Sequence, residues 1–92
     1  MTLALRSIQG EIEVSTGDPE TALVIYRAVK PEVEDSPSER SSMSIDLDDD
    51  LITISISATD SASFRAALNS SIRWVKLSME MIDTLKSLDL SD

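Results

Sequence analysis

The chain has 92 residues, of which 41% are hydrophobic and 3% aromatic, and this composition fits one folded domain, residues 1–92, with a modest aliphatic core. Because it contains no Cys and no His, a disulfide framework is excluded, and the commonest general base and zinc ligand are missing. The formal net charge of −9 opposes nonspecific binding of nucleic acid by the chain as a whole.

The first predicted element is a strand at about residues 5–14, where apolar and polar side chains alternate. On its apolar side we expect Gly10 to lie beneath a bulky neighbour, although a backbone bulge would also place a glycine there. Residues 1–14, MTLALRSIQGEIEV, are too short and too polar for a signal peptide or a membrane span, so we expect a cytoplasmic protein with no membrane partner. The apolar side carries Ile8, Gly10, Ile12 and Val14, and the polar side Gln9, Glu11 and Glu13.

A helix is predicted over about residues 19–29. Asp18 is a favourable N-cap, and Pro19 suits the first helical position because that position needs no backbone N–H donor. Pro31 disfavours the helical conformation of the residue before it, so we expect the helix to end there. The polar residues 30–41 are then expected to form a loop.

Residues 42–57 alternate between apolar and polar on both sides of an aspartate run, which predicts a β-hairpin. A long helix follows at about residues 61–87, a stretch without Gly or Pro. The order β-α-β-β-α predicts a two-layer α+β domain, with a three-stranded antiparallel sheet and both helices on one face. Since such a sheet has two open edges, we expect a homodimer in which the sheet continues from one chain into the other.

No catalytic residue, metal site or cofactor is predicted. Asp46, Asp48 and Asp50 have the spacing of the start of a calcium-binding EF-hand loop, but Leu51 stands where that loop needs Gly and Ser57 where it needs Glu. We therefore expect a solvated hairpin tip. The sequence also lacks a nucleophile in a recognisable setting such as G-x-S-x-G, and it lacks a Gly-rich phosphate loop. An enzyme that acts on its own is therefore not expected.

The apolar residues of the long helix fall in two neighbouring stripes. At ~1.5 Å per residue the helix spans ~40 Å, which is more than a small sheet needs as cover. One stripe is expected to pack on the sheet and the other to contact a partner; alternatively, both belong to one wide core face with a loosely packed end. The first stripe is Phe64, Leu68, Ser71, Val75, Met79 and Ile82, and the second is Ala67, Trp74, Met81, Leu85 and Leu88.

Another face of the long helix forms a basic stripe in an otherwise acidic chain. The stripe consists of Arg65, Asn69, Arg73 and Lys76, which lie within an arc of ~80° over three turns. Arg can contact a phosphate through two hydrogen bonds, and Asn can bond a base edge. The stripe could therefore help to hold RNA, or it could be a solvated face on which Arg73 and Lys76 pair with Glu80.

Residues 63–76, SFRAALNSSIRWVK, resemble the signature S-x-R-x-x-L-N-S-x-x-R-W-x-K of the small dimerising subunit of the KEOPS tRNA-modification complex. That family includes the archaeal subunit and, more distantly, the human cancer/testis antigen relatives. The preceding residues 52–60, ITISISATD, are similar to the family's last strand and the entry to its helix. The predicted element order also matches, so the resemblance covers nearly the whole chain. The chain departs from the family in its strong acidity and in having few Lys residues.

The resemblance implies a non-catalytic scaffold. KEOPS makes threonylcarbamoyladenosine at position 37 of tRNAs that read codons beginning with A, and in that family the small subunit dimerises, docks the catalytic subunit and assists tRNA binding. The basic stripe then becomes a candidate for tRNA contact. The alternatives are a stand-alone RNA-binding domain of KH-like shape, although the chain has no G-x-x-G loop, and a generic dimeric adaptor. The candidates for docking the catalytic subunit are Trp74, Leu77, Met81 and Leu85.

Overall fold

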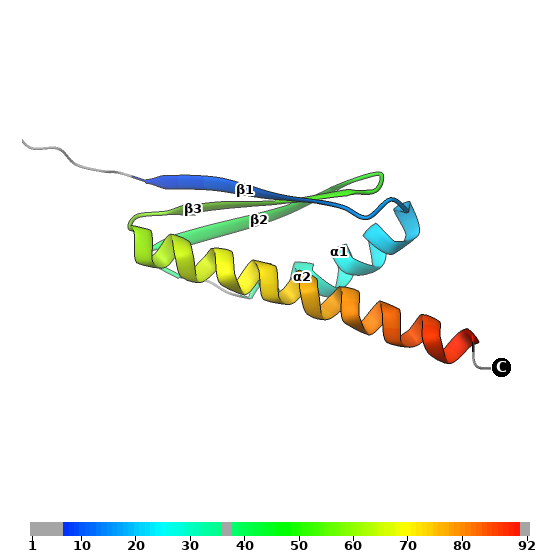
Figure 1. Ribbon diagram of the computed structural model, residues 1–92. Helices are drawn as coiled ribbons and strands as arrows, with labels where there is room; N and C mark the ends of the chain where they lie inside the picture. Colours follow the sequence, from blue (N-terminus) through cyan, green and yellow to red (C-terminus); the bar gives the residue numbers. More distant parts are fainter. Residues whose placement is uncertain (1–6, 36–37, 91–92) are drawn as a thin grey trace, which may run out of the picture.

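The computed structural model describes residues 7–35 and 38–90, and it contains three strands and two helices in the order β-α-β-β-α (Figure 1). Both helices lie on the same side of one antiparallel sheet, which confirms the predicted two-layer α+β fold. Residues 5 and 6 of the first predicted strand lie outside the described residues. The elements are β1 (Ile8–Ser15), α1 (Pro19–Glu34), β2 (Ser41–Asp48), β3 (Leu51–Ala58) and α2 (Ser61–Leu90).

Strand β3 lies at the centre of the sheet, with β1 on one side and β2 on the other. Its side chains alternate strictly, so that Ile52, Ile54 and Ile56 are buried beneath the helices. One row across the sheet joins Ile12 of β1, Ile54 of β3 and Ile45 of β2. The core therefore sits between β3 and the two helices, and β1 and β2 are the two edges.

The turn between β2 and β3 consists of Asp49 and Asp50. Asp49 adopts a φ of 57°, in the left-handed region that aspartate tolerates better than most residues. The carbonyl oxygen of Asp50 accepts hydrogen bonds from the backbone N–H of Thr16 at 3.0 Å and from its hydroxyl at 3.1 Å. The hairpin tip is thereby attached to the segment that leads from β1 into α1.

Helix α1 begins as predicted but continues beyond its predicted end. Asp18 accepts a hydrogen bond from the backbone N–H of Thr21 at 3.2 Å, and Pro19 occupies the first turn. The prediction that Pro31 ends the helix is wrong, because the helix extends to Glu34. Proline removes only one hydrogen bond there, near the helix end, while the added turn buries Val33 in the core.

Helix α2 crosses the sheet diagonally and continues past it (Figure 1). Its first half approaches the sheet closely, because a Cβ added at Gly10 would lie 2.7 Å from the Phe64 ring. This confirms the expectation of a bulky neighbour over Gly10. Two turns further along, the buried Ser71 hydroxyl donates to the Ala67 carbonyl at 2.9 Å, so its polar group is satisfied inside the helix.

Candidate functional site

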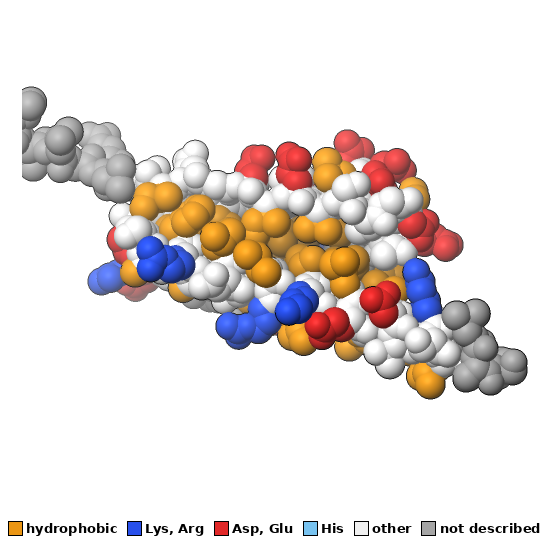
Figure 2. Space-filling view, in the orientation of Figure 1, with side chains coloured by type: hydrophobic (Ala, Val, Ile, Leu, Met, Phe, Trp, Pro, Cys, Tyr) orange, Lys and Arg blue, Asp and Glu red, His pale blue; other side chains and the backbone are white. Residues whose placement is uncertain are grey.

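An apolar groove runs between β1 and α2, with a volume of about 520 Å³. Figure 2 shows it as part of a continuous band of hydrophobic side chains on one face of the molecule. Charged groups of α2 stand at its margin. The groove is lined by Ile12 and Val14 from β1 and by Ile72, Val75, Lys76, Met79, Glu80 and Asp83 from α2.

The groove exists because the helices cover the sheet unevenly. Helix α1 packs against β2, and α2 packs chiefly on β3, so the inner side of β1 receives little cover from its own chain. Ile12 and Val14 are consequently only half-buried, whereas Ile54 beside Ile12 is fully buried. On the α2 side of the groove, Ile72 and Met79 keep 49% and 45% of their surface exposed. Apolar area on both walls thus remains in contact with water.

The same strand also has an open backbone edge. Among the described strands, β1 forms its ladder with β3 alone, so on its other side half of its N–H and C=O groups point away from the sheet. An edge of this kind can pair with another strand. The open edge and the groove lie next to each other along β1, and together they form one surface, which we call the β1 face.

A second apolar surface lies on the other flank of α2. Leu77, Met81 and Leu85 are exposed by 55%, 64% and 55%, and Trp74 is half-buried. At ~100° per residue, Met81 and Met79 point ~160° apart around the helix. This second surface, the docking flank, is therefore separate from the groove. Val24 of α1 is also exposed and apolar.

The side chains of the basic stripe are exposed to solvent at the margin of the groove. Arg65, Asn69, Arg73 and Lys76 are all exposed, and Lys76 also lines the groove. Within the part of the chain that the structure describes, neither Arg73 nor Lys76 forms an ion pair with Glu80. The cationic groups are thus available to another molecule.

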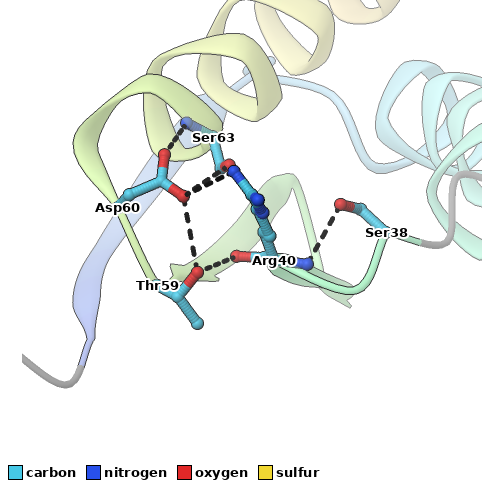
Figure 3. A network of polar contacts seen from close by, with 5 residues as sticks. All are labelled: Ser38, Arg40, Thr59, Asp60 and Ser63. Atoms are coloured by element: carbon cyan, nitrogen blue, oxygen red, sulfur yellow. Dashed lines mark hydrogen bonds and ion pairs between the residues drawn. The ribbon is translucent and has the colours of Figure 1, made fainter.

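A polar network fixes the start of α2 against the start of β2 (Figure 3). Asp60 accepts hydrogen bonds from the backbone N–H of Ser63 at 2.7 Å and from its hydroxyl at 3.0 Å, and the Arg40 guanidinium lies 4.0 Å away. The backbone N–H of Ser63, then its hydroxyl, and more weakly Arg40 lower the pKa of Asp60 below 3.8. Thr59 donates its backbone N–H to the Arg40 carbonyl at 2.8 Å. The network holds the start of the helix that carries the basic stripe, the docking flank and one wall of the groove.

The hairpin aspartates are not arranged as a cation site. Asp46 and Asp48 are exposed on the outer side of β2, and the backbone of Asp50 is engaged with Thr16. Among residues 7–35 and 38–90, no three carboxylates are close enough to form a metal site. In the same residues, neither helix is long and apolar enough to cross a membrane.

Sequence reasoning did not identify the groove. Met79 was assigned to the core stripe, and Ile72 was assigned to no stripe. Periodicity alone does not show which strand the helix leaves uncovered, and in the structure that strand is β1. The available signal was the position of Ile72 and Met79, ~40–60° from the buried Val75 around the helix, on the side away from Met81.

The architecture defines a small two-layer α+β domain with exposed apolar surfaces on β1 and α2. Residues 9–83 match the protein family described as Transcription factor Pcc1, and the chain belongs to that family. It is similar to the KEOPS complex subunit Pcc1 of Pyrococcus abyssi, with 28% identity over 78 residues. This alignment covers 85% of the present chain and 95% of the archaeal protein.

Proposed function

We propose that this chain is a dimerising, non-catalytic scaffold subunit of a KEOPS complex that makes threonylcarbamoyladenosine at position 37 of tRNA. The family membership and the similarity to an archaeal KEOPS subunit support this assignment. The observation that carries the scaffold role is the pair of separate apolar surfaces, the β1 face and the docking flank. One surface joins two copies and the other binds the catalytic subunit.

The β1 face suits pairing with a second copy. If two β1 strands pair edge to edge around a two-fold axis, the sheet continues over six strands and the unpaired backbone groups of both edges are satisfied. The same arrangement brings the two grooves together on one side of the sheet. Ile72 and Met79 of each chain then gain apolar cover that their own chain does not supply.

The docking flank suits an amphipathic helix of the catalytic subunit. It presents three exposed aliphatic or thioether side chains at helical spacing. Every described side chain of α2 after Ile82 is exposed as well. An incoming helix could pack along Leu77, Met81 and Leu85. Because this flank is ~160° from the groove, dimerisation and docking do not compete for it.

The basic stripe supports a role in tRNA binding within the assembly. Arg65 and Arg73 are exposed and can contact phosphates, but the chain carries a net charge of −9. The stripe therefore assists binding when partners supply most of the positive charge. Strong binding of tRNA by the isolated chain would instead favour a stand-alone RNA-binding domain.

Reconstitution with the catalytic subunit tests the assignment. We expect Met81→Lys to abolish co-elution with that subunit but to leave the dimer intact, and Ile72→Lys to weaken the dimer. Ser87→Lys adds the same charge to an exposed position of α2 away from the docking flank, and it should change neither. A complex that tolerates Met81→Lys would exclude the docking flank. A Met81→Lys chain that fails to fold, as judged by circular dichroism, would show that the flank belongs to the core.

The contribution to tRNA is tested in the full assembly. Replacing Arg65 and Arg73 by Glu should weaken tRNA binding and reduce its dependence on salt, because each Arg that contacts a phosphate adds about one unit to the salt slope. The exchange of Glu for Arg at these exposed sites should leave the folding of the chain unchanged. Unaltered tRNA affinity and salt slope would exclude the basic stripe from the RNA interface.

A further inference from the structure

The outer side of β1, opposite the groove, carries two carboxylates for which the described residues supply no ion pair. Glu11 and Glu13 are exposed there, and their cross-strand neighbours on β3 are the neutral Ser55 and Thr53. The three strands contain no Lys or Arg. Among residues 7–35 and 38–90, neither glutamate therefore has a cationic neighbour on its strand or the adjacent strands, and neither forms an ion pair.

Pairing of two β1 strands restricts which residues face each other. A two-fold axis perpendicular to the sheet makes the strands antiparallel, and directly opposite residues then point to the same side. Since the apolar residues of both chains must face the helices, outer residues can oppose only outer residues. A register that pairs all eight residues would break this rule, because it would set Ile8 against Ser15 of the partner subunit.

Two registers keep this rule with the greatest overlap of the strands, and both place glutamates of the two chains opposite each other. In one, Glu11 lies directly opposite Glu11 of the partner subunit. In the other, Glu11 lies opposite Glu13 of the partner subunit, and the symmetry repeats this contact. Directly opposite side chains have Cβ atoms ~4.5–5.5 Å apart, and like charges at that separation destabilise the pairing. Strand β1 is thus apolar on its inner side, and on its outer side its glutamates repel those of a second copy.

We propose that Glu11 and Glu13 make dimerisation dependent on salt. Dimerisation is complete only when dissolved ions screen the repulsion between the glutamates along the seam, the line where the two β1 strands pair. The inference rests on the proposed function, since it takes the dimer along the β1 face as its starting point. Raising the ionic strength from 0.1 M to 1 M shortens the screening length from ~10 Å to ~3 Å. That change spans the separation of the opposed carboxylates. Ionic strength therefore sets the fraction of paired chains.

The test is the dissociation constant of the dimer, measured by sedimentation equilibrium in 0.1 M and 1 M KCl. We expect the wild-type dimer to tighten roughly three- to tenfold, as the one like-charge contact of the first register or the two of the second imply. Glu11→Gln/Glu13→Gln should be tight at both concentrations. Because each chain carries a net charge of −9, some salt dependence is general. Glu20→Gln/Glu32→Gln removes two exposed charges from α1 and should keep the wild-type response.

A mixing experiment tests the geometry of the seam. Wild-type chain and Glu11→Lys/Glu13→Lys chain, distinguished by mass, are combined in low salt and counted by native mass spectrometry. In either register a mixed dimer places Lys opposite Glu, so mixed dimers should exceed the statistical half of all dimers. A statistical mixture would show that residues 11 and 13 of the two chains do not face each other, and it would overturn the inference.

The outcomes separate the inference from the function beneath it. If the Gln pair on β1 and the Gln pair on α1 respond equally to salt, the seam does not control the dimer and the inference fails, while the dimer stands. If the wild-type chain and the Gln pair on β1 are monomeric at every concentration of protein and salt, the dimer itself fails. Retained circular dichroism of each variant establishes that folding is not the cause.

Discussion

The two edges of the sheet differ in how completely their own chain covers them. Ile45 on β2 and Ile12 on β1 occupy the same row, one on each side of Ile54. Helix α1 packs on β2 and leaves Ile45 only 9% exposed, whereas Ile12 is half-buried in the groove. The inner side of β2 is therefore covered by a helix of its own chain. The β1 edge keeps its groove and its outer row of backbone groups open.

The largest expected effect is the loss of Ile45. Ile45→Ala removes most of a side chain that is buried in the core, and we expect the free energy of unfolding to fall by about 3 kcal/mol. Ile12→Ala removes the same atoms from a half-solvated site, so about 1 kcal/mol is expected. Urea unfolding at a protein concentration that keeps the chain monomeric measures both values.

Protein concentration provides the control for this pair. When the dimer is populated, Ile12→Ala should cost more than it does in the monomer, because the second copy covers that site in the proposed arrangement. The cost of Ile45→Ala should not change. Equal costs for the two variants in the monomer would contradict the difference between the edges.

A smaller effect is expected where β1 meets α2. In Gly10→Ala, the new methyl group would lie 2.7 Å from the Phe64 ring, so the ring or the strand must move. Overpacking of this kind costs roughly 1–3 kcal/mol. Thermal unfolding should show the loss, and Phe64→Leu in the same chain should restore part of it. If Gly10→Ala is as stable as wild type, β1 is held less closely to α2 than the structure indicates.

Local patterns were sufficient to predict much of this fold. The alternation of apolar residues identified the strands, and Asp18 with Pro19 identified the start of α1, because each signal acts within a few residues. The sequence also predicted a bulky neighbour over Gly10, but it could not identify that neighbour as Phe64. Contacts between elements distant in the sequence required the structure.

Two features escaped prediction for that reason. The rule that ends a helix before proline is local, and the burial of Val33 beyond Pro31 outweighed it. The strand order β1-β3-β2 is not encoded in alternation, so spacing placed Ile72 and Met79 beside the buried Val75 but could not show that β1 leaves them exposed. The candidate residues of the docking flank were identifiable from periodicity, and their role stays a prediction.

The smallest expected effect concerns the two aspartates that anchor the edges. Asp18 follows β1 and caps α1, and Asp60 caps α2 beside Arg40, which precedes β2. The hydroxyl and then the backbone N–H of Thr21 lower the pKa of Asp18 below 3.8, as the bonds from Ser63 do for Asp60.

A carboxyl group whose pKa is lower in the folded chain stabilises folding above its unfolded pKa, and this stability is lost as pH falls through the folded value. Wild-type stability should therefore decline below about pH 4, the region of the unfolded pKa. Asp18→Asn and Asp60→Asn should each be less stable at pH 7 and decline less on acidification. Thermal unfolding from pH 7 to pH 2.5 measures this, and parallel declines in all three chains would show that neither cap senses pH. Since Asp60 also faces Arg40 across the start of β2, its substitution should loosen the covered edge, while that of Asp18 should act on α1.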